Sequence, residues 1–172
     1  MGAIQEKDWR IKIGATFLDI SLTFLDSNNQ PVDLGGYTAK LVAKTAPDDT
    51  VPQLICFDSS YTVPAWSISN PYVFGDVVVE TGSYYFCLVN NTGNDPQNPN
   101  PNDATVYWKQ TAAGIVTLGG TLGTVDVVVG ADQTALLTVA PTMAYDLFLY
   151  NGVDDTVCAM QGRFVFIQKS NL

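Results

Sequence analysis

The amino-acid sequence predicts an all-β fold, an antiparallel β-sandwich that carries a small inserted β module. Three observations predict it. Apolar and polar residues alternate with a period of two over many short segments, which is typical of half-buried strands. Gly, Pro, Asn and Asp separate these segments at short intervals, as turns require. Hydrophobic residues make up 47% of the 172 residues, so the chain can bury a substantial core.

The first three expected strands lie in the N-terminal third of the chain. In residues 17–26, Leu, Ile, Leu and Phe alternate with Asp, Ser and Thr. Residues 37–44 alternate in the same way, and we expect this second strand to pair antiparallel with the first. Residues 51–57 form the third strand, where Pro52 indicates either a sheet edge or the start of a strand.

Five more strands are expected in the C-terminal part of the chain, at residues 115–118, 122–129, 134–139, 145–150 and 157–168. The last of them is apolar on both faces, which predicts a strand in the interior of a sheet. Helical periodicity is nearly absent. A short turn over the residues that follow Asp132 is the one candidate.

The middle of the chain has a different composition. A run of Asn and Pro over residues 90–102 is too polar for a core, so we expect a long surface loop there. Before it, two apolar runs joined by Thr81-Gly82 predict a hairpin. The sequence therefore predicts a discontinuous sandwich of residues 1–58 and 112–172, with an inserted β module of residues 59–111.

Charge and apolar patterning exclude several classes of partner. The net charge is −9, from 8 basic and 17 acidic residues, and no cluster of Lys and Arg offsets it, so we expect no nucleic-acid partner. No apolar run approaches the roughly 20 residues of a membrane span, so we expect no membrane insertion. The first ten residues lack the apolar region of a secretory signal, which predicts a protein made in the cytoplasm.

The three cysteines, Cys56, Cys87 and Cys158, lie far apart in apolar runs. This placement is typical of reduced core residues in a protein of a reducing compartment. A Cys56–Cys87 disulfide is the alternative.

Residue types that carry catalysis are scarce in this chain. It contains no His, which removes the most common general base and most transition-metal sites. The carboxylate pairs Asp48/Asp49 and Asp154/Asp155 fall in expected turns, where Asp is a turn former. Glu80 follows an expected strand, where a solvated strand end is favoured and a buried carboxyl is the alternative. The sequence therefore predicts that the protein is not an enzyme.

Cofactor and metal motifs are also missing. Gly35-Gly36 and Gly119-Gly120 have neither the spacing nor the Lys of a phosphate-binding loop. Asp95 and Asp103 could offer oxygen ligands to calcium, but their Pro-rich loop has no regular ligand spacing. We therefore expect no cofactor and no bound metal.

Aromatic residues give the strongest functional signal. The candidate ligand-binding residues in the expected insert are Trp66, Tyr85, Tyr107 and Trp108. Exposed aromatic rings stack on the apolar faces of sugars, while neighbouring Asn and Asp side chains bind the hydroxyls. The alternative is that these rings form the core of the small module, and this alternative is favoured for Trp66.

The sandwich segments contain four ordered motifs: Gly14-Ala-Thr-Phe17, residues 29–38 around the first turn, Tyr145-Asp-Leu147 and Gln161-Gly-Arg-Phe-Val165. Together they resemble the immunoglobulin-like domain of tailed-bacteriophage structural proteins, such as the N-terminal domain of baseplate upper proteins. The resemblance covers roughly residues 10–58 and 113–170. It implies an Ig-like sandwich that serves as a docking platform in a virion.

The expected insert resembles small carbohydrate-binding modules of the chitin-binding type. The matching residues are Ala65-Trp66, Tyr72, Gly75-Asp-Val77, Gly82, Tyr84-Tyr-Phe-Cys87, Pro96 and Tyr107-Trp108. The sugar contacts of that family are exposed aromatics. The resemblance therefore implies contacts at Tyr85 and Trp108.

These resemblances imply a bacteriophage virion structural protein, assembled in the bacterial cytoplasm as a tail or baseplate adaptor or as a capsid-surface decoration. Its expected partners are other virion proteins, with multiple copies in each particle and a host-surface glycan as a further ligand. The alternative is a stand-alone carbohydrate-binding protein that is not part of a virion. A carboxylate hydrolase is the third class.

Overall fold

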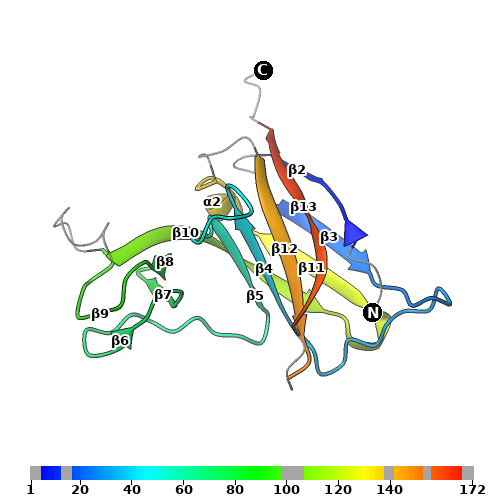
Figure 1. Ribbon diagram of the computed structural model, residues 1–172, viewed down its shortest axis with the longest axis horizontal. Coiled ribbons are helices and arrows are strands. Elements are labelled where there is room, and N and C mark those ends of the chain that lie inside the picture. Colours follow the sequence, from blue (N-terminus) through cyan, green and yellow to red (C-terminus); the bar gives the residue numbers. More distant parts are fainter. Residues whose placement is uncertain (1–4, 13–16, 98–106, 138–141, 153–155, 168–172) are drawn as a thin grey trace. The chain divides into compact units, whose positions relative to one another are not determined.

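A computed structural model describes residues 5–12, 17–97, 107–137, 142–152 and 156–167 of the chain (Figure 1). Nearly all of its regular structure is β, which confirms the predicted class. The elements, in chain order, are β1 (Gln5–Glu6), β2 (Trp9–Lys12), β3 (Phe17–Thr23), β4 (Thr38–Lys44), β5 (Leu54–Asp58), β6 (Pro71–Tyr72), β7 (Val77–Glu80), β8 (Ser83–Cys87), β9 (Asn91–Thr92), β10 (Trp108–Leu118), the 3₁₀ helix η1 (Gly120–Leu122), β11 (Thr124–Val129), α2 (Ala131–Thr134), β12 (Thr142–Tyr150) and β13 (Thr156–Ile167).

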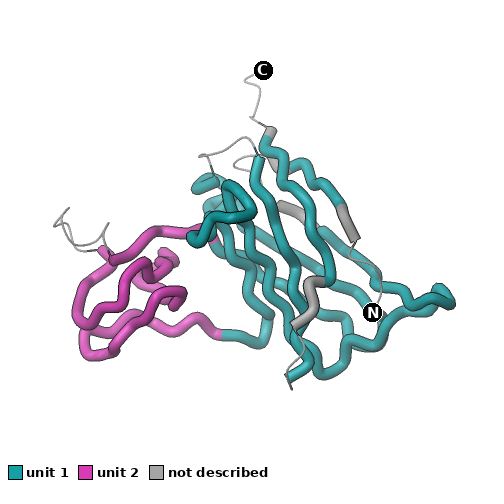
Figure 2. The backbone as a smooth tube through the Cα atoms, viewed as in Figure 1, with its two compact units in different colours: residues 1–61, 113–172 teal, residues 62–112 magenta. Residues whose placement is uncertain are grey.

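The chain divides into two compact units (Figure 2). The first unit comprises residues 1–61 and 113–172, and the second unit comprises residues 62–112, so the boundaries lie within a few residues of the expected 59–111. The strand β10 belongs to both units, because its first residues pair with β8 and its last residues pair with β11. The short strand expected at residues 115–118 is therefore the end of a longer one.

The first unit is built on one curled sheet. Its strands follow the order β1-β13-β12-β4-β5-β10-β11-β3, and β2 also pairs with β13. The curl places β3 and β11 behind β12 and β13 in the view of Figure 1, which produces the sandwich. Pairing is antiparallel between β12 and both of its neighbours, whereas β1 and β2 lie parallel to β13. No sequence pattern indicated these parallel N-terminal strands.

The one strand pairing predicted for the early strands is wrong. The strand β4 pairs with β5 and β12, not with β3, which has β11 as its partner in the sheet. Pro52 precedes the start of β5, as one of its two interpretations required, but β5 lies between β4 and β10 and is not an edge. Alternation fixes which residues face the core, but it does not identify the neighbouring strand.

The strand expected at residues 134–139 is also wrong over its described part. Residues Ala131–Thr134 form α2, whose last residue is fully buried and donates its hydroxyl to the carbonyl of Ala131. The alternative reading, a short turn after Asp132, is the correct one. Residues 138–139 lie outside the described residues.

Alternating strands supply the core of the first unit, as predicted. In β4 the side chains of Ala39, Leu41 and Ala43 are buried, while their neighbours are partly or fully exposed. Three alternate residues of β12, Tyr145, Leu147 and Leu149, are buried in the same way. The expected interior position of the last strand is confirmed, because β13 has β12 on one side and β1 and β2 on the other.

The described cysteines are buried and reduced. Cys56 and Cys87 are both free thiols, so the alternative Cys56–Cys87 disulfide is not present. Burial raises the pKa of each thiol, which keeps both protonated at neutral pH. The side chain of Cys158 lies outside the described residues.

The second unit contains the predicted hairpin. The strands β7 and β8 pair antiparallel around Thr81 and Gly82, whose φ angles are 44° and 80°. Two successive positive φ angles match the right-handed twist of a two-residue hairpin, and glycine adopts such an angle without strain. A separate short pair, β6 with β9, completes the unit. In the part of the chain that the structure describes, no helix is long and apolar enough to cross a membrane.

Candidate functional site

The four aromatic residues predicted to bind a ligand all belong to one cluster in the second unit. The cluster is formed by buried Tyr72, Val78, Cys87 and Trp108, and Trp66, Tyr85 and Tyr107 pack against it half-buried. These rings therefore form the core of the unit, as the alternative interpretation held.

Trp108 corrects the expectation of a stacking face most clearly. Its side chain is 3% exposed, and its Nε1–H donates to the carbonyl oxygen of Asn94 at 2.7 Å. The Tyr72 ring meets it edge to face, with 5.1 Å between ring centroids. A ring that is enclosed and hydrogen-bonded in this way has no face left for a sugar.

Tyr85 lies on the same side of the β7–β8–β10 sheet as this cluster. It is in register with Val78 on β7 and Gln110 on β10, and Val78 is fully buried. Because alternate residues face opposite sides of a sheet, Phe86 faces the other side. The second face of the sheet therefore has its own apolar residues, and it leads to a different surface.

That surface is an apolar turn next to Phe86. Val73, Phe74 and Val89 are 54%, 49% and 46% exposed, although each is a large hydrophobic residue. The pairing of β6 with β9 brings the chain segments that carry them side by side, since Tyr72 pairs with Asn91. We refer to Val73, Phe74 and Val89 as the apolar turn.

Four backbone contacts hold the apolar turn in one conformation. The Asp76 carboxylate accepts from the Val73 N–H at 2.8 Å, and the Asp76 N–H donates to the Val73 carbonyl at 3.1 Å. The Asn90 side-chain oxygen accepts from the Phe74 N–H at 2.8 Å, and the Gly75 N–H donates to the Cys87 carbonyl oxygen at 3.1 Å. Gly75 has a φ of +100°, which side chains other than glycine rarely adopt.

The Phe74 ring packs on the protein with one part and is exposed to solvent with the rest. It contacts the buried Phe86 ring edge to face, with 5.5 Å between centroids and an interplanar angle of 89°. Asn90 is exposed and Asp76 is partly exposed, and their side chains accept from the backbone N–H groups of Phe74 and Val73. A rigid exposed aromatic ring with polar groups at its side is the arrangement that binds sugar rings and peptide side chains.

The sequence contains a signal for the apolar turn that alternation alone does not reveal. Val73-Phe74 stands directly before Gly75-Asp76, a turn-forming pair, so a bulky aromatic occupies a turn. Large apolar residues in turns are exposed by necessity, because turns lie on the surface.

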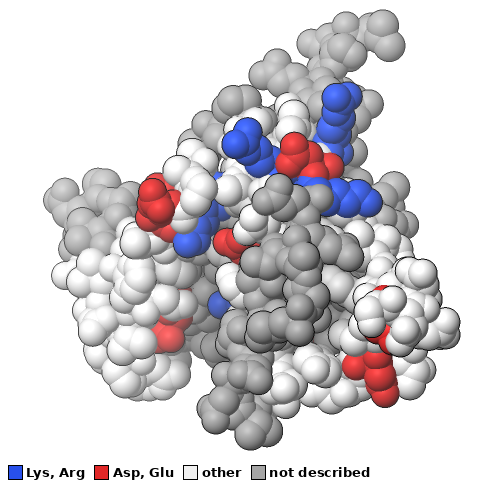
Figure 3. Space-filling model, turned by 45° about the vertical axis from the view of Figure 1, so that its right-hand side comes forward, with Lys and Arg blue, Asp and Glu red and all other residues white. Residues whose placement is uncertain are grey.

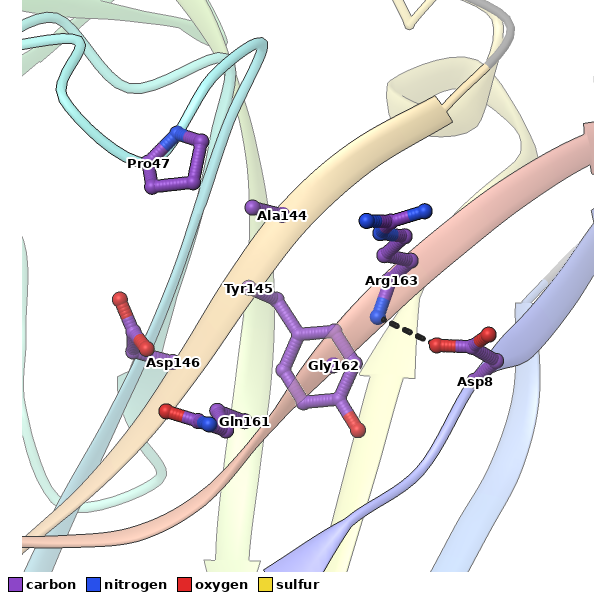
Figure 4. A pocket seen from close by; sticks show the side chains of 8 residues that line it. All are labelled: Asp8, Pro47, Ala144, Tyr145, Asp146, Gln161, Gly162 and Arg163. Atoms are coloured by element: carbon purple, nitrogen blue, oxygen red, sulfur yellow. Dashed lines mark hydrogen bonds between the residues drawn. The ribbon is translucent and has the colours of Figure 1, made fainter.

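A hollow lies in the first unit, and two of its polar side chains, Asp8 and Tyr145, already bind other parts of the chain. It measures about 410 Å³ and is lined by Asp8, Pro47, Ala144, Tyr145, Asp146, Gln161, Gly162 and Arg163 (Figure 4). The Asp8 carboxylate accepts from the Arg163 backbone N–H, and the Tyr145 hydroxyl contacts both Trp9 and Lys7. These groups fix the protein's own N-terminal segment, so the hollow is not the stronger candidate for an external ligand.

Charge is mixed on the face drawn in Figure 3. Lys and Arg side chains gather in its upper part, and Asp and Glu side chains lie among them. The register of the sheet also places opposite charges near one another, because Lys44 and Arg163 both pair with Ala144 and Asp146 is two residues along the same strand. This face therefore lacks the single-sign field that recruits a polyanion.

The carboxylate pairs considered in the sequence have structural roles where they are described. Asp49 accepts from the Ala46 N–H and so closes the turn that contains Asp48, and Asp154 and Asp155 lie outside the described residues. Within the described ranges, no group of three or more His, Cys, Asp or Glu side chains could hold a metal ion. Asp103, one of the two calcium candidates, lies outside these ranges.

Glu80 is not a solvated strand end, as the sequence suggested. Its Oε2 atom is buried without a hydrogen-bond partner among the described residues. Burial raises the pKa of the Glu80 carboxyl, and both a hydrogen bond and the negative charge of Asp95 raise it further. Asp95 also accepts from the Gln97 N–H at 2.7 Å, and the Gln97 amide donates to the Glu80 carbonyl at 3.1 Å. This carboxyl pair ties the long loop to the β7–β8 hairpin.

The pair predicts a pH dependence of stability. A carboxyl whose pKa is higher in the folded state than in the unfolded state binds its proton more tightly when folded. Its stabilising contribution is complete below the ordinary Glu value of 4.5, and it is lost as the pH rises through the raised pKa. Relative to Glu80→Gln, the wild-type chain should therefore melt at progressively lower temperatures as the pH rises from 4.5, as thermal unfolding at a series of pH values will measure.

Asp95→Asn is the matched variant, because it removes the carboxylate whose negative charge raises the pKa of Glu80 and leaves Glu80 itself in place. Asp95→Asn should remove only part of the pH dependence that Glu80→Gln removes, because burial, the largest cause of the raised Glu80 pKa, remains. A wild-type pH profile that runs parallel to those of both variants would show that neither burial nor Asp95 raises the pKa of the Glu80 carboxyl.

No family model matches this chain, and no curated protein or solved structure matches it either.

Proposed function

We propose that this protein is a non-enzymatic bacteriophage virion component, in which the first unit docks on the particle and the second unit displays a weak glycan-binding surface. The observation that carries the binding part of the proposal is the apolar turn, with Phe74 held rigidly at 49% exposure. The docking part is supported by the resemblance of the sandwich segments to phage structural domains and by a sheet whose last strand, β3, pairs on one side within the described residues.

The proposed mechanism uses stacking and avidity. The Phe74 ring would take the apolar face of a sugar ring, while the Asn90 amide and the Asp76 carboxylate bind its hydroxyls. One exposed ring gives weak binding because little surface is buried. Many copies on a symmetric particle convert weak single contacts into firm attachment to a host surface.

Phe74→Ala tests the binding surface. We expect the wild-type chain, coupled in several copies to a bead or a streptavidin tetramer, to bind immobilised N-acetylglucosamine oligomers or bacterial cell-wall glycans. The Phe74→Ala chain should lose this binding, with a change of only about 1 kcal/mol in the free energy of unfolding, because the ring contributes one edge-to-face contact. Glycan-array binding and urea unfolding measure the two quantities.

Tyr61→Ala is the matched control, because Tyr61 is an aromatic residue with 54% exposure in the first unit. It should leave glycan binding unchanged. Equal binding by wild type and Phe74→Ala would reject the apolar turn as the glycan site.

The docking part is tested on particles. The chain should remain with intact virions through a density gradient, and antibodies against it should label the particle surface. The alternative function, a stand-alone carbohydrate-binding protein, predicts instead that the chain stays in the soluble fraction of the lysed host. It also predicts that the purified monomer binds glycans tightly without multivalent display.

A further inference from the structure

The N-terminal segment is held on the sheet in an unusual way. β1 and β2 lie parallel to β13, the last strand of the chain, and cover its free edge at Met160–Gln161 and Phe164–Ile167. A parallel pair cannot be joined by a hairpin, so no tight turn connects this segment to the strand that it covers. The next strand in the chain, β3, lies at the opposite end of the strand order.

A set of specific contacts fixes the segment where β1 ends and β2 has not yet begun. The Lys7 N–H donates to the Gln161 carbonyl at 3.1 Å, and the Tyr145 hydroxyl donates to the Lys7 carbonyl at 2.6 Å. The Asp8 carboxylate accepts from the Arg163 N–H at 3.0 Å, as the dashed line in Figure 4 shows. We refer to these contacts as the latch.

Tyr145 connects the latch to the core. Its hydroxyl accepts from the Trp9 Nε1–H at 2.6 Å while it donates to Lys7, and its ring stacks on Phe164 with 4.6 Å between centroids. Burial raises the pKa of Tyr145 to about 12, so the hydroxyl keeps its proton and remains a donor at physiological pH.

Gly162 makes room for the latch. A Cβ atom at this position would lie 2.0 Å from the Lys7 carbonyl oxygen and 3.1 Å from the Tyr145 ring. The backbone of β13 is therefore shaped to receive one particular segment at one particular register. A binding site for residues 5–12 is therefore formed by Gly162, the Tyr145 hydroxyl and the Arg163 N–H. Among the described residues, no loop that connects neighbouring strands contributes to it.

We propose that residues 5–12 exchange between copies of this chain, so that the N-terminal strand of one copy lies on β13 of a second copy. The second copy is the partner because every latch group is carried by the chain itself, and the same contacts form between two chains as within one. Exchange therefore costs little beyond the entropy of association. The proposal does not depend on the proposed function, although a virion would supply the high local concentration that favours exchange.

A segment from either copy can cover this edge of β13. Without residues 5–12, β13 would expose unpaired N–H and C=O groups along its edge, and such an edge recruits any available strand. A segment from a neighbouring copy satisfies these groups and links the two copies. Reciprocal exchange closes a dimer, whereas one-way exchange continues into a chain of copies.

Cross-linking between two different full-length chains tests the proposal. Arg10 and Val165 are register partners on β2 and β13. One chain carries Arg10→Cys and the other carries Val165→Cys, and Cys158→Ser is present in both. After the two folded chains are mixed at high concentration and oxidised, a disulfide-linked heterodimer should form several-fold more than in a mixture of Arg10→Cys with Ile115→Cys, an exposed position on β10 outside the β2–β13 pair.

A chain with both Arg10→Cys and Val165→Cys completes the test. At low concentration it should form the disulfide within one chain, which shows that the engineered pair can react. If this chain cross-links internally while the mixed chains give no heterodimer above the Ile115→Cys mixture at any concentration, the strand does not exchange and the proposal fails. The melting temperature of each variant establishes that the chains compared are folded.

Discussion

Gly162→Ala is expected to lower the free energy of unfolding by about 2–3 kcal/mol, the upper part of the roughly 1–3 kcal/mol that an added methyl group costs in a packed site. The alanine Cβ would lie 2.0 Å from the Lys7 carbonyl oxygen, and that oxygen belongs to the backbone, so no side chain can rotate away to relieve the overlap. Either β13 shifts or the N-terminal segment moves off it. In both cases the hydrogen bond from the Tyr145 hydroxyl to Lys7 is weakened or lost.

The effect should be local as well as global. Urea unfolding measures the free energy, and amide hydrogen exchange should show protection lost first at the Lys7 N–H, which donates to Gln161, and along β2. The pairs of β4 with β5 should keep their protection, because β12 separates them from β13.

Gly152→Ala is the matched control. A Cβ at Gly152 meets nothing within 4 Å, and its φ of +83° alone gives an expected cost of about 1 kcal/mol. If the two variants lose equal stability, the close approach at Gly162 has no energetic weight and the latch is not a tight contact.

Sequence patterns predicted this fold unevenly, and β4 and β13 show why. The alternation in residues 37–44 depends only on which side chains are apolar, and the residue type alone determines that. The neighbour of β4 depends on contacts with residues about 100 positions away in β12, and many strands have the same pattern. The role of Gly162 likewise depends on contacts between distant segments, because it appears only when residues 5–12 lie on β13.

The candidate site was predicted less well than the fold, for a related reason. Trp and Tyr are large enough to serve either as a core or as a binding face, and residue type does not distinguish the two uses. In the second unit the rings of Trp66, Tyr85 and Trp108 belong to the core of a module of about fifty residues. The exposed ring, Phe74, is marked by its place in a turn and not by its chemistry.

Trp108→Ala is expected to have the largest effect of any single substitution in the second unit, about 3–5 kcal/mol in the free energy of unfolding. The indole is 3% exposed, so its removal leaves a large cavity beside Tyr72. It also removes the donor that the Asn94 carbonyl oxygen accepts at 2.7 Å. The measurement is thermal and urea unfolding, combined with hydrogen exchange at the amides of β7 and β8.

Trp108→Phe separates the two contributions. It keeps most of the apolar volume but not the hydrogen bond to Asn94, so its cost should fall between those of wild type and Trp108→Ala. Phe74→Ala is the control for an aromatic residue of the same unit that is half exposed, and its cost should be about 1 kcal/mol.

The contrast between Trp108 and Phe74 decides which ring of the second unit is free to bind. Removal of a buried ring should destabilise the unit, and glycan binding should then fall only in proportion to the unfolded fraction of the chain. Removal of an exposed ring should abolish glycan binding while the unit stays folded. If Trp108→Ala left the melting temperature unchanged and abolished glycan binding, the indole would be a contact residue, and the core described around Tyr72, Val78 and Cys87 would have to form without it.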